Sequence, residues 1–70
     1  MEIFAERLRE LREEKGISIN KLAKEIGVDH STIVRWEKGD RVPTIDNLYL
    51  VAKFFNVSSD YLIELSNDVC

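Results

Sequence analysis

The chain has few of the residues on which many small folds depend. Its 70 residues include one cysteine, Cys70, and one histidine, His30. A disulfide within the monomer needs two cysteines, and a structural zinc site usually takes four ligands from cysteine and histidine, so both are excluded. No apolar run approaches the roughly 20 residues that span a bilayer. We therefore expect a protein without a metal, another cofactor or a membrane partner.

Glycine and proline are also scarce. Each of the three glycines, Gly16, Gly27 and Gly39, follows an amphipathic stretch, as expected of residues that end helices in a left-handed conformation. The only proline, Pro43, falls in a connection. No glycine-rich phosphate loop occurs, and His30 has no nucleophile partner beyond hydroxyls of its own helix. An enzyme is therefore the least favoured function class.

The length is that of one domain, expected over residues 1–65, with a short tail at 66–70. Apolar residues make up 44% of the chain and charged residues 33%, which is typical of a globular domain rather than a disordered one. The first seven residues are acidic and amphipathic, unlike a signal peptide, so we expect a cytoplasmic protein.

The net charge of −3 argues against nucleic-acid binding until its distribution is considered. Residues 1–14 carry a net charge of −2 and residues 42–70 carry −3, whereas residues 15–41 carry +2. A local basic face can serve a small DNA footprint, although acidic flanks weaken non-specific binding. A nucleic-acid site is therefore expected in the middle of the chain.

Period-3.6 patterning recurs along the chain without sustained period-2 alternation, which predicts an all-α fold of five helices. The first helix is expected over Glu2–Lys15. The other four are expected after residues whose side chains can cap a helix: Ser18, Asp29, Thr44 and Ser58. The residues expected to face the core recur at helical spacing: Phe4, Leu8, Leu11, Leu22, Ala23, Ile26, Val28, Ile33, Trp36, Leu48, Val51, Ala52, Phe55, Tyr61, Leu62 and Leu65.

Residues 18–38 contain two short amphipathic stretches separated by Gly27. Each stretch opens on a capping residue, Ser18 in the first and Asp29 in the second. This is the layout of a helix-turn-helix, in which the second helix is held out for insertion into the major groove of DNA. The segment 29–38 is therefore the expected recognition helix.

Several motifs in order make the chain similar to a known family. They are R-L-R-E-L-R-E-E-K-G-I-S at 7–18, L-A at 22–23, I-G-V-D at 26–29, S-T-I-V-R-W-E-K-G at 31–39, Pro43, and L-V-A-K-F-F-N-V-S-S-D-Y-L at 50–62. With them the chain resembles the phage-repressor-like helix-turn-helix family, also called the XRE or Cro-type family, over nearly its whole length. The resemblance implies a compact, lambda-repressor-like fold and a sequence-specific transcriptional regulator that binds double-stranded DNA.

The resemblance also implies roles for individual residues. The residues expected to contact base edges are His30, Ser31, Thr32 and Arg35. The residues expected to contact phosphates lie at the start of the second helix and around the loop after the third: Ser18, Asn20, Lys21, Lys38 and Arg41. A structural ion pair is implied between Arg12 and Glu37. The alternative is that these residues make no DNA contact. Arg35 would then be a solvent-exposed helix residue paired with an acid, and Lys21 would only keep its helix soluble.

One position departs from the family pattern. Many members place a glutamine directly after the cap of the second helix, where it holds a phosphate, and this chain has Ile19 there. Because an isoleucine cannot donate a hydrogen bond, that contact is lost or passes to Asn20. The departure and the acidic ends of the chain favour an alternative function, a protein-binding adaptor of antitoxin-like or anti-repressor-like type with weakened DNA contacts.

Members of the family commonly dimerise through their C-terminal helices. The resemblance therefore implies a homodimer on a palindromic operator, with half-sites about 34 Å apart on one face of the duplex. Apolar residues of the C-terminal part that could take part in such a dimer are Tyr49, Ile63 and Val69.

Overall fold

The computed structural model describes residues 2–63, and these residues form five α-helices and no strand. The helices are α1 (Glu2–Lys15), α2 (Ile19–Ile26), α3 (His30–Lys38), α4 (Ile45–Phe55) and α5 (Ser59–Ile63). None of these helices has the length and apolar character needed to cross a membrane. The predicted all-α, five-helix fold class is confirmed. Leu65, Val69, Cys70 and the expected tail at 66–70 lie outside the described residues.

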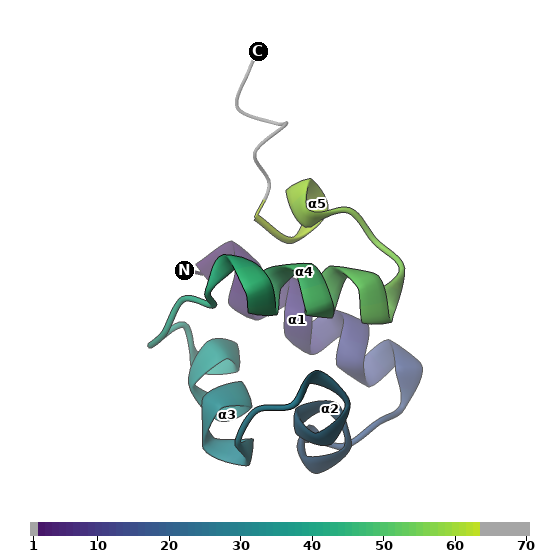
Figure 1. The fold of residues 1–70 in the computed structure, drawn as a ribbon, viewed down its shortest axis with the longest axis vertical. Helices are drawn as coiled ribbons and strands as arrows, with labels where there is room; N and C mark the ends of the chain where they lie inside the picture. Colours follow the sequence, from purple (N-terminus) through teal and green to yellow (C-terminus); the bar gives the residue numbers. More distant parts are fainter. Residues whose placement is uncertain (1, 64–70) are drawn as a thin grey trace.

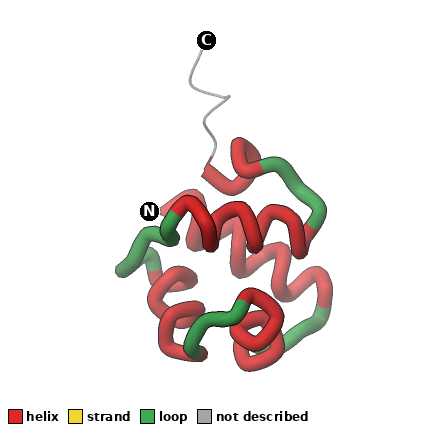
Figure 2. The backbone as a smooth tube through the Cα atoms, viewed as in Figure 1, coloured by secondary structure: helices red, strands yellow, loops and turns green. Residues whose placement is uncertain are grey.

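The helices are arranged in three levels around α1. In Figure 1, α4 crosses in front of α1, α2 and α3 lie side by side below them, and α5 lies above. Short loops join successive helices, as the green segments of Figure 2 show. α1 packs against α3 and α5, and α2 packs against α3 and α4. The lower side of the molecule in Figure 1 is therefore formed by the helix-turn-helix.

The core takes apolar residues from all five helices. The buried members are Phe4, Ala5, Leu8, Leu22, Ala23, Ile26, Ile33, Trp36, Val51, Ala52 and Leu62. The ring of Phe4 meets that of Trp36 edge-on, with centroids 5.8 Å apart and an interplanar angle of 75°. Edge-to-face contacts of this kind are favourable beyond the area that they bury. This contact fixes α3 against α1.

Three of the four predicted caps form. The hydroxyl of Ser18 accepts the Lys21 N–H at 3.0 Å, and Thr44 and Ser58 accept from the residues three positions on at 3.2 and 3.1 Å. The prediction for Asp29 is wrong in one respect, because Asp29 occupies the N-cap position of α3 but its side chain accepts no capping hydrogen bond. The Thr32 N–H, which a capping carboxylate could take, donates to the Asp29 carbonyl oxygen at 3.0 Å instead.

The prediction that Tyr61 faces the core is also wrong. Its side chain is 40% exposed, whereas the next residue, Leu62, is fully buried. The guanidinium of Arg7 lies over the Tyr61 ring, 4.3 Å from its centroid, and its Nη1 donates to the Tyr61 carbonyl oxygen at 3.0 Å. Because adjacent residues of an α-helix point about 100° apart, Tyr61 is turned toward the surface when Leu62 points inward. Arg7 therefore holds α5 against α1 from the surface.

Candidate nucleic-acid interface

The turn between α2 and α3 sets the relation between the two helices. Gly27 has a left-handed φ of 90°, and its N–H donates to the Ala23 carbonyl oxygen at 2.8 Å. The Val28 N–H donates to the same oxygen at 3.0 Å, and the Val28 side chain packs against the core. Glycine adopts this backbone conformation without the strain that a Cβ would cause. The turn is therefore anchored by backbone hydrogen bonds above and an apolar side chain below.

α3 has one side in the core and one side in solvent. Ile33 and Trp36 are buried on the inner side. Because successive residues of an α-helix are about 100° apart, a second set falls on the outer side. The members of this set are all exposed: His30, Ser31, Arg35 and Lys38. Three of the four residues that the sequence assigned to base contacts thus share one solvent-facing surface.

Thr32 lies elsewhere. It is half-buried at the edge of α3 that faces the loop to α4. There it lines a shallow cavity together with Trp36 and Arg41. Thr32 is therefore placed at the margin of the outer surface of α3 rather than within it.

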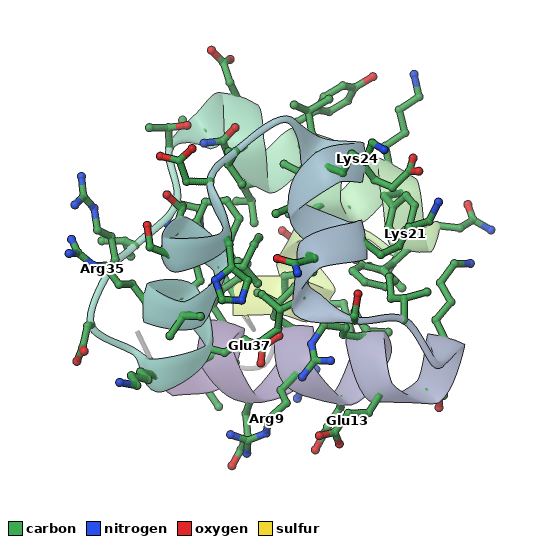
Figure 3. All side chains as sticks on the ribbon, turned by 90° about the horizontal axis from the view of Figure 1, so that it is seen from below. Arg9, Glu13, Lys21, Lys24, Arg35 and Glu37 are labelled. Atoms are coloured by element: carbon green, nitrogen blue, oxygen red, sulfur yellow. The ribbon has the colours of Figure 1, made fainter. Side chains whose placement is uncertain are left out.

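Basic side chains lie at both edges of the surface formed by α2 and α3. Figure 3 views the α2–α3 side and shows Arg35 projecting from α3 at one edge, with Lys21 and Lys24 on α2 at the other. Nζ of Lys21 lies 2.9 Å from Oε2 of Glu25, one turn further along α2. This pair was not predicted from the sequence, although its i, i+4 spacing is a recognised signal. The charge of Lys21 is therefore partly neutralised by Glu25 of the same helix.

The remaining candidates for phosphate contacts lie at helix ends. Ser18 uses its oxygen as a cap acceptor, so its own O–H is left to donate. Asn20 is exposed in the first turn of α2, where the helix dipole favours an anion. Lys38 and Arg41 are exposed at the end of α3 and in the loop that follows. These candidates thus lie in two separate places, at the start of α2 and around the end of α3, and do not form one continuous basic patch.

Arg12 of α1 joins α3 to the loop that precedes α2. Its Nε donates to Oε2 of Glu37 at 2.6 Å and its Nη2 donates to Oε1 at 3.2 Å, while Nη1 donates to the Ile17 carbonyl oxygen at 3.0 Å. Only 14% and 8% of the Arg12 and Glu37 side chains are exposed. The hydrogen bond with Glu37 raises the pKa of Arg12, although burial acts in the opposite direction. In Figure 3, Glu37 lies between α3 and α1.

Ile19, the departure from the family pattern, has a structural explanation. Its side chain is half-buried and packs against the core. The position thus contributes apolar contact at the start of α2, and its neighbour Asn20 is exposed. Among residues 2–63, no three His, Cys, Asp or Glu side chains are grouped so that they could hold a metal ion.

Comparisons with known proteins place the chain among regulators. A family model described as helix-turn-helix matches residues 8–62. The uncharacterized HTH-type transcriptional regulator YobD of Bacillus subtilis is 32% identical over 66 residues, which cover 94% of this chain and 59% of YobD. The cryptic phage CTXphi transcriptional repressor RstR of Vibrio cholerae is 33% identical over 55 residues, which cover 79% of this chain and 50% of RstR. The chain thus spans between half and three fifths of these two relatives.

The fold leads to the same group. The crystal structure of the restriction-modification controller protein C.AhdI from Aeromonas hydrophila matches with a TM-score of 0.79 at 34% identity, over 87% of this chain and 92% of that one. The family match includes the helix-turn-helix, the Arg12–Glu37 pair and most of the core. The chain therefore belongs to the XRE-type helix-turn-helix family of DNA-binding transcriptional regulators, which are not enzymes.

Proposed function

We propose that the chain binds double-stranded DNA sequence-specifically as a repressor-like regulator, with α3 in the major groove. The observation that carries the proposal is the division of α3, whose inner side is fixed by Trp36 and Glu37 while its outer side is exposed. A recognition helix needs both properties, because its register must be rigid and its reading side chains must be accessible. Since such a regulator acts on chromosomal or phage DNA, we place it in the cytoplasm.

Each proposed DNA contact follows from the chemistry of an exposed side chain. Arg35 presents two parallel donors that fit guanine O6 and N7, and His30 and Ser31 each offer a donor to a base or a phosphate. Thr32, from the margin of the outer surface, is proposed to contact the backbone or a thymine methyl group. Ser18, Asn20 and Lys21 grip phosphates from the start of α2, and Lys38 and Arg41 from the end of α3. Two copies bind half-sites about 34 Å apart.

Selection of bound duplexes from a random pool tests this proposal. The parent chain is expected to enrich a two-fold symmetric motif that contains a guanine in each half-site. Arg35→Ala is expected to lose the requirement for that guanine and to bind the parent motif about 10- to 100-fold more weakly, since a bidentate arginine–guanine contact is worth about 1–3 kcal/mol. Arg9→Ala, which removes an exposed arginine from α1, is the matched control and should enrich the parent motif.

The competing function is a protein-binding adaptor. The net charge of −3 and the absence of a donor side chain at Ile19 are the observations that favour it. Failure to enrich any motif, even at low salt where phosphate contacts are strongest, would support the adaptor and reject the regulator. A motif shared unchanged by the parent and Arg35→Ala would reject the assigned reading residue alone.

Glu25→Gln is expected to strengthen DNA binding about threefold at low salt, because it releases Lys21 from its ion pair and adds up to one phosphate contact. The slope of log K against log salt should become steeper by up to about 0.9. Fluorescence anisotropy over a salt series measures both quantities. Glu10→Gln removes the same charge from the exposed side of α1 and should leave the slope unchanged. Equal changes in both variants would mean that only the net charge matters.

A further inference from the structure

α4 carries three large apolar side chains that nothing in the described chain covers. Ile45, at its start, is 83% exposed. In the middle of the helix Tyr49 is 58% exposed and Leu50 is 40% exposed, while Val51 and Ala52, which follow them, are buried. A single exposed apolar residue is unremarkable in a monomer. Two neighbours in the middle of a helix face that points away from the core form a surface suited to a partner.

Charged residues of opposite sign lie at the two ends of this surface. Asp46 and Lys53, both exposed, are seven residues apart, which is about two helical turns or about 10.5 Å along α4. Seven residues return close to the same angle, so both charges lie on the midline of the face, with Tyr49 on one flank and Leu50 on the other. Among residues 2–63, no ion pair involves Asp46, and Nζ of Lys53 lies 5.8 Å from the Tyr49 ring centroid.

The charge pattern of this face of α4 is complementary to the same pattern on an antiparallel helix. Turning the helix end for end about a point midway between Tyr49 and Leu50 exchanges the position of Asp46 with that of Lys53. A two-fold symmetric contact requires this property, because the same patch must serve on both sides. The charge complementarity therefore selects a second copy of this chain as the occupant.

We propose that α4 packs antiparallel against α4 of a second copy, about a two-fold axis that passes between Tyr49 and Leu50. In this register each Asp46 faces Lys53 of the second copy. Tyr49 meets its own equivalent across the axis along one flank of the helix pair, and Leu50 meets its equivalent across the axis along the other flank. The proposal deepens the dimer proposed above and rests on it, since it names the surface and the register.

The arrangement of the helices is compatible with DNA binding by such a pair. When two helices meet face to face and antiparallel, the two-fold axis is perpendicular both to the helices and to the line that joins them. Figure 1 shows α2 and α3 below α4, and α1 behind it. An axis that runs vertically in this view keeps the α3 helices of both copies on the same side. A palindromic operator requires that placement.

The proposed contact is small. One helix face buries less than the roughly 1,600 Å² of a standard interface, so the dimer should be weak and sensitive to its two ion pairs. In the homodimer of Asp46→Lys, two lysines face each other at each end of the contact. In the homodimer of Lys53→Asp, two aspartates face each other at each end. In a mixture of these two variants, each heterodimer instead has opposite charges at both ends. The register thus predicts recovery upon mixing.

Sedimentation equilibrium without DNA tests the pairing. The parent chain should dimerise, each single variant should have a dimer dissociation constant at least tenfold higher, and an equimolar mixture should return to within about threefold of the parent. The double variant Asp46→Lys/Lys53→Asp should recover as a homodimer. Far-UV circular dichroism of each variant checks that the helices are intact, and the mixture contains the same folded chains as its separate components.

Glu10→Lys and Lys24→Asp make the same charge changes at exposed sites on α1 and α2 and should leave dimerisation unchanged. A monomeric parent, single variants that dimerise like the parent, or no recovery upon mixing would each overturn the α4 pairing. These results do not depend on DNA. Loss of the pairing while a symmetric motif is still enriched would reject the register alone, and recovery upon mixing without any enriched motif would reject the DNA-binding function alone.

Discussion

Glu37→Ala is expected to lower the free energy of unfolding by about 3 kcal/mol. The side chain of Arg12 is only 14% exposed. Of the acceptors described for its guanidinium, the substitution leaves only the Ile17 carbonyl oxygen. The charge then keeps its desolvation cost and loses the carboxylate that offset it. Urea-induced unfolding followed by far-UV circular dichroism measures the loss.

Two further variants separate burial from charge. Glu25→Ala breaks the exposed pair with Lys21 and should cost less than about 0.5 kcal/mol, because solvent screens both partners. The double variant Arg12→Met/Glu37→Leu should return to within about 1 kcal/mol of the parent, since it leaves no unpaired buried charge. Equal losses in Glu37→Ala and Glu25→Ala would contradict the account.

The pH dependence of this effect follows from the raised pKa of Arg12. A cation whose pKa is raised by folding contributes stability that is fully present below the pKa of the unfolded chain and is lost only as the pH rises through the folded value. For arginine, both values lie beyond the ordinary working range. The titration of Arg12 should therefore add no difference to the loss caused by Glu37→Ala between about pH 6 and about pH 9.

Trp36→Ala is expected to cost about 3–5 kcal/mol, which is the usual range for deleting a buried tryptophan. Trp36 is 2% exposed and meets Phe4 edge-on, so truncation removes the contact that fixes α3 against α1. A domain of 70 residues has a total stability of only about 4–10 kcal/mol, so Trp36→Ala should remove a large part of it and lower the midpoint of thermal unfolding. Thermal unfolding followed at 222 nm measures this without relying on the lost fluorophore.

Ile45→Ala provides the comparison, because Ile45 is 83% exposed at the start of α4. Its loss should stay within about 0.5 kcal/mol. DNA binding by Trp36→Ala should fall in proportion to the folded fraction. If Trp36→Ala unfolded at the same temperature as Ile45→Ala, the placement of Trp36 at the centre of the core would be wrong.

Helix positions could be predicted because their signals are local. The first helix was expected over Glu2–Lys15, and α1 has those bounds. The hydroxyl caps formed because a serine or threonine oxygen has a donor within reach three residues on. Asp29 shows the limit of this reasoning. Residue type identifies the N-cap position, but the backbone carbonyl had already taken the donor that the carboxylate was expected to bind.

Contacts between distant segments could not be derived from spacing. The Arg12–Glu37 pair joins residues 25 positions apart and was expected only through resemblance to a family. The contact between Arg7 and the Tyr61 carbonyl spans 54 positions, and no local pattern indicates it. The exposed outer side of α3 was predictable, since helical periodicity alone separates it from Ile33 and Trp36. Its three-dimensional neighbours were not.

α3 meets the rest of the protein through one side only. Ile33, Trp36 and Glu37 make its contacts with the core and with α1, whereas His30, Ser31 and Arg35 stand in solvent. Under the proposed function, the residues of this nine-residue helix that stabilise the fold are thus distinct from those proposed to select the DNA target. A few base changes in the gene can therefore alter the operator that such a domain binds and leave its folding intact. Duplicated copies of the gene can in this way become regulators of different genes.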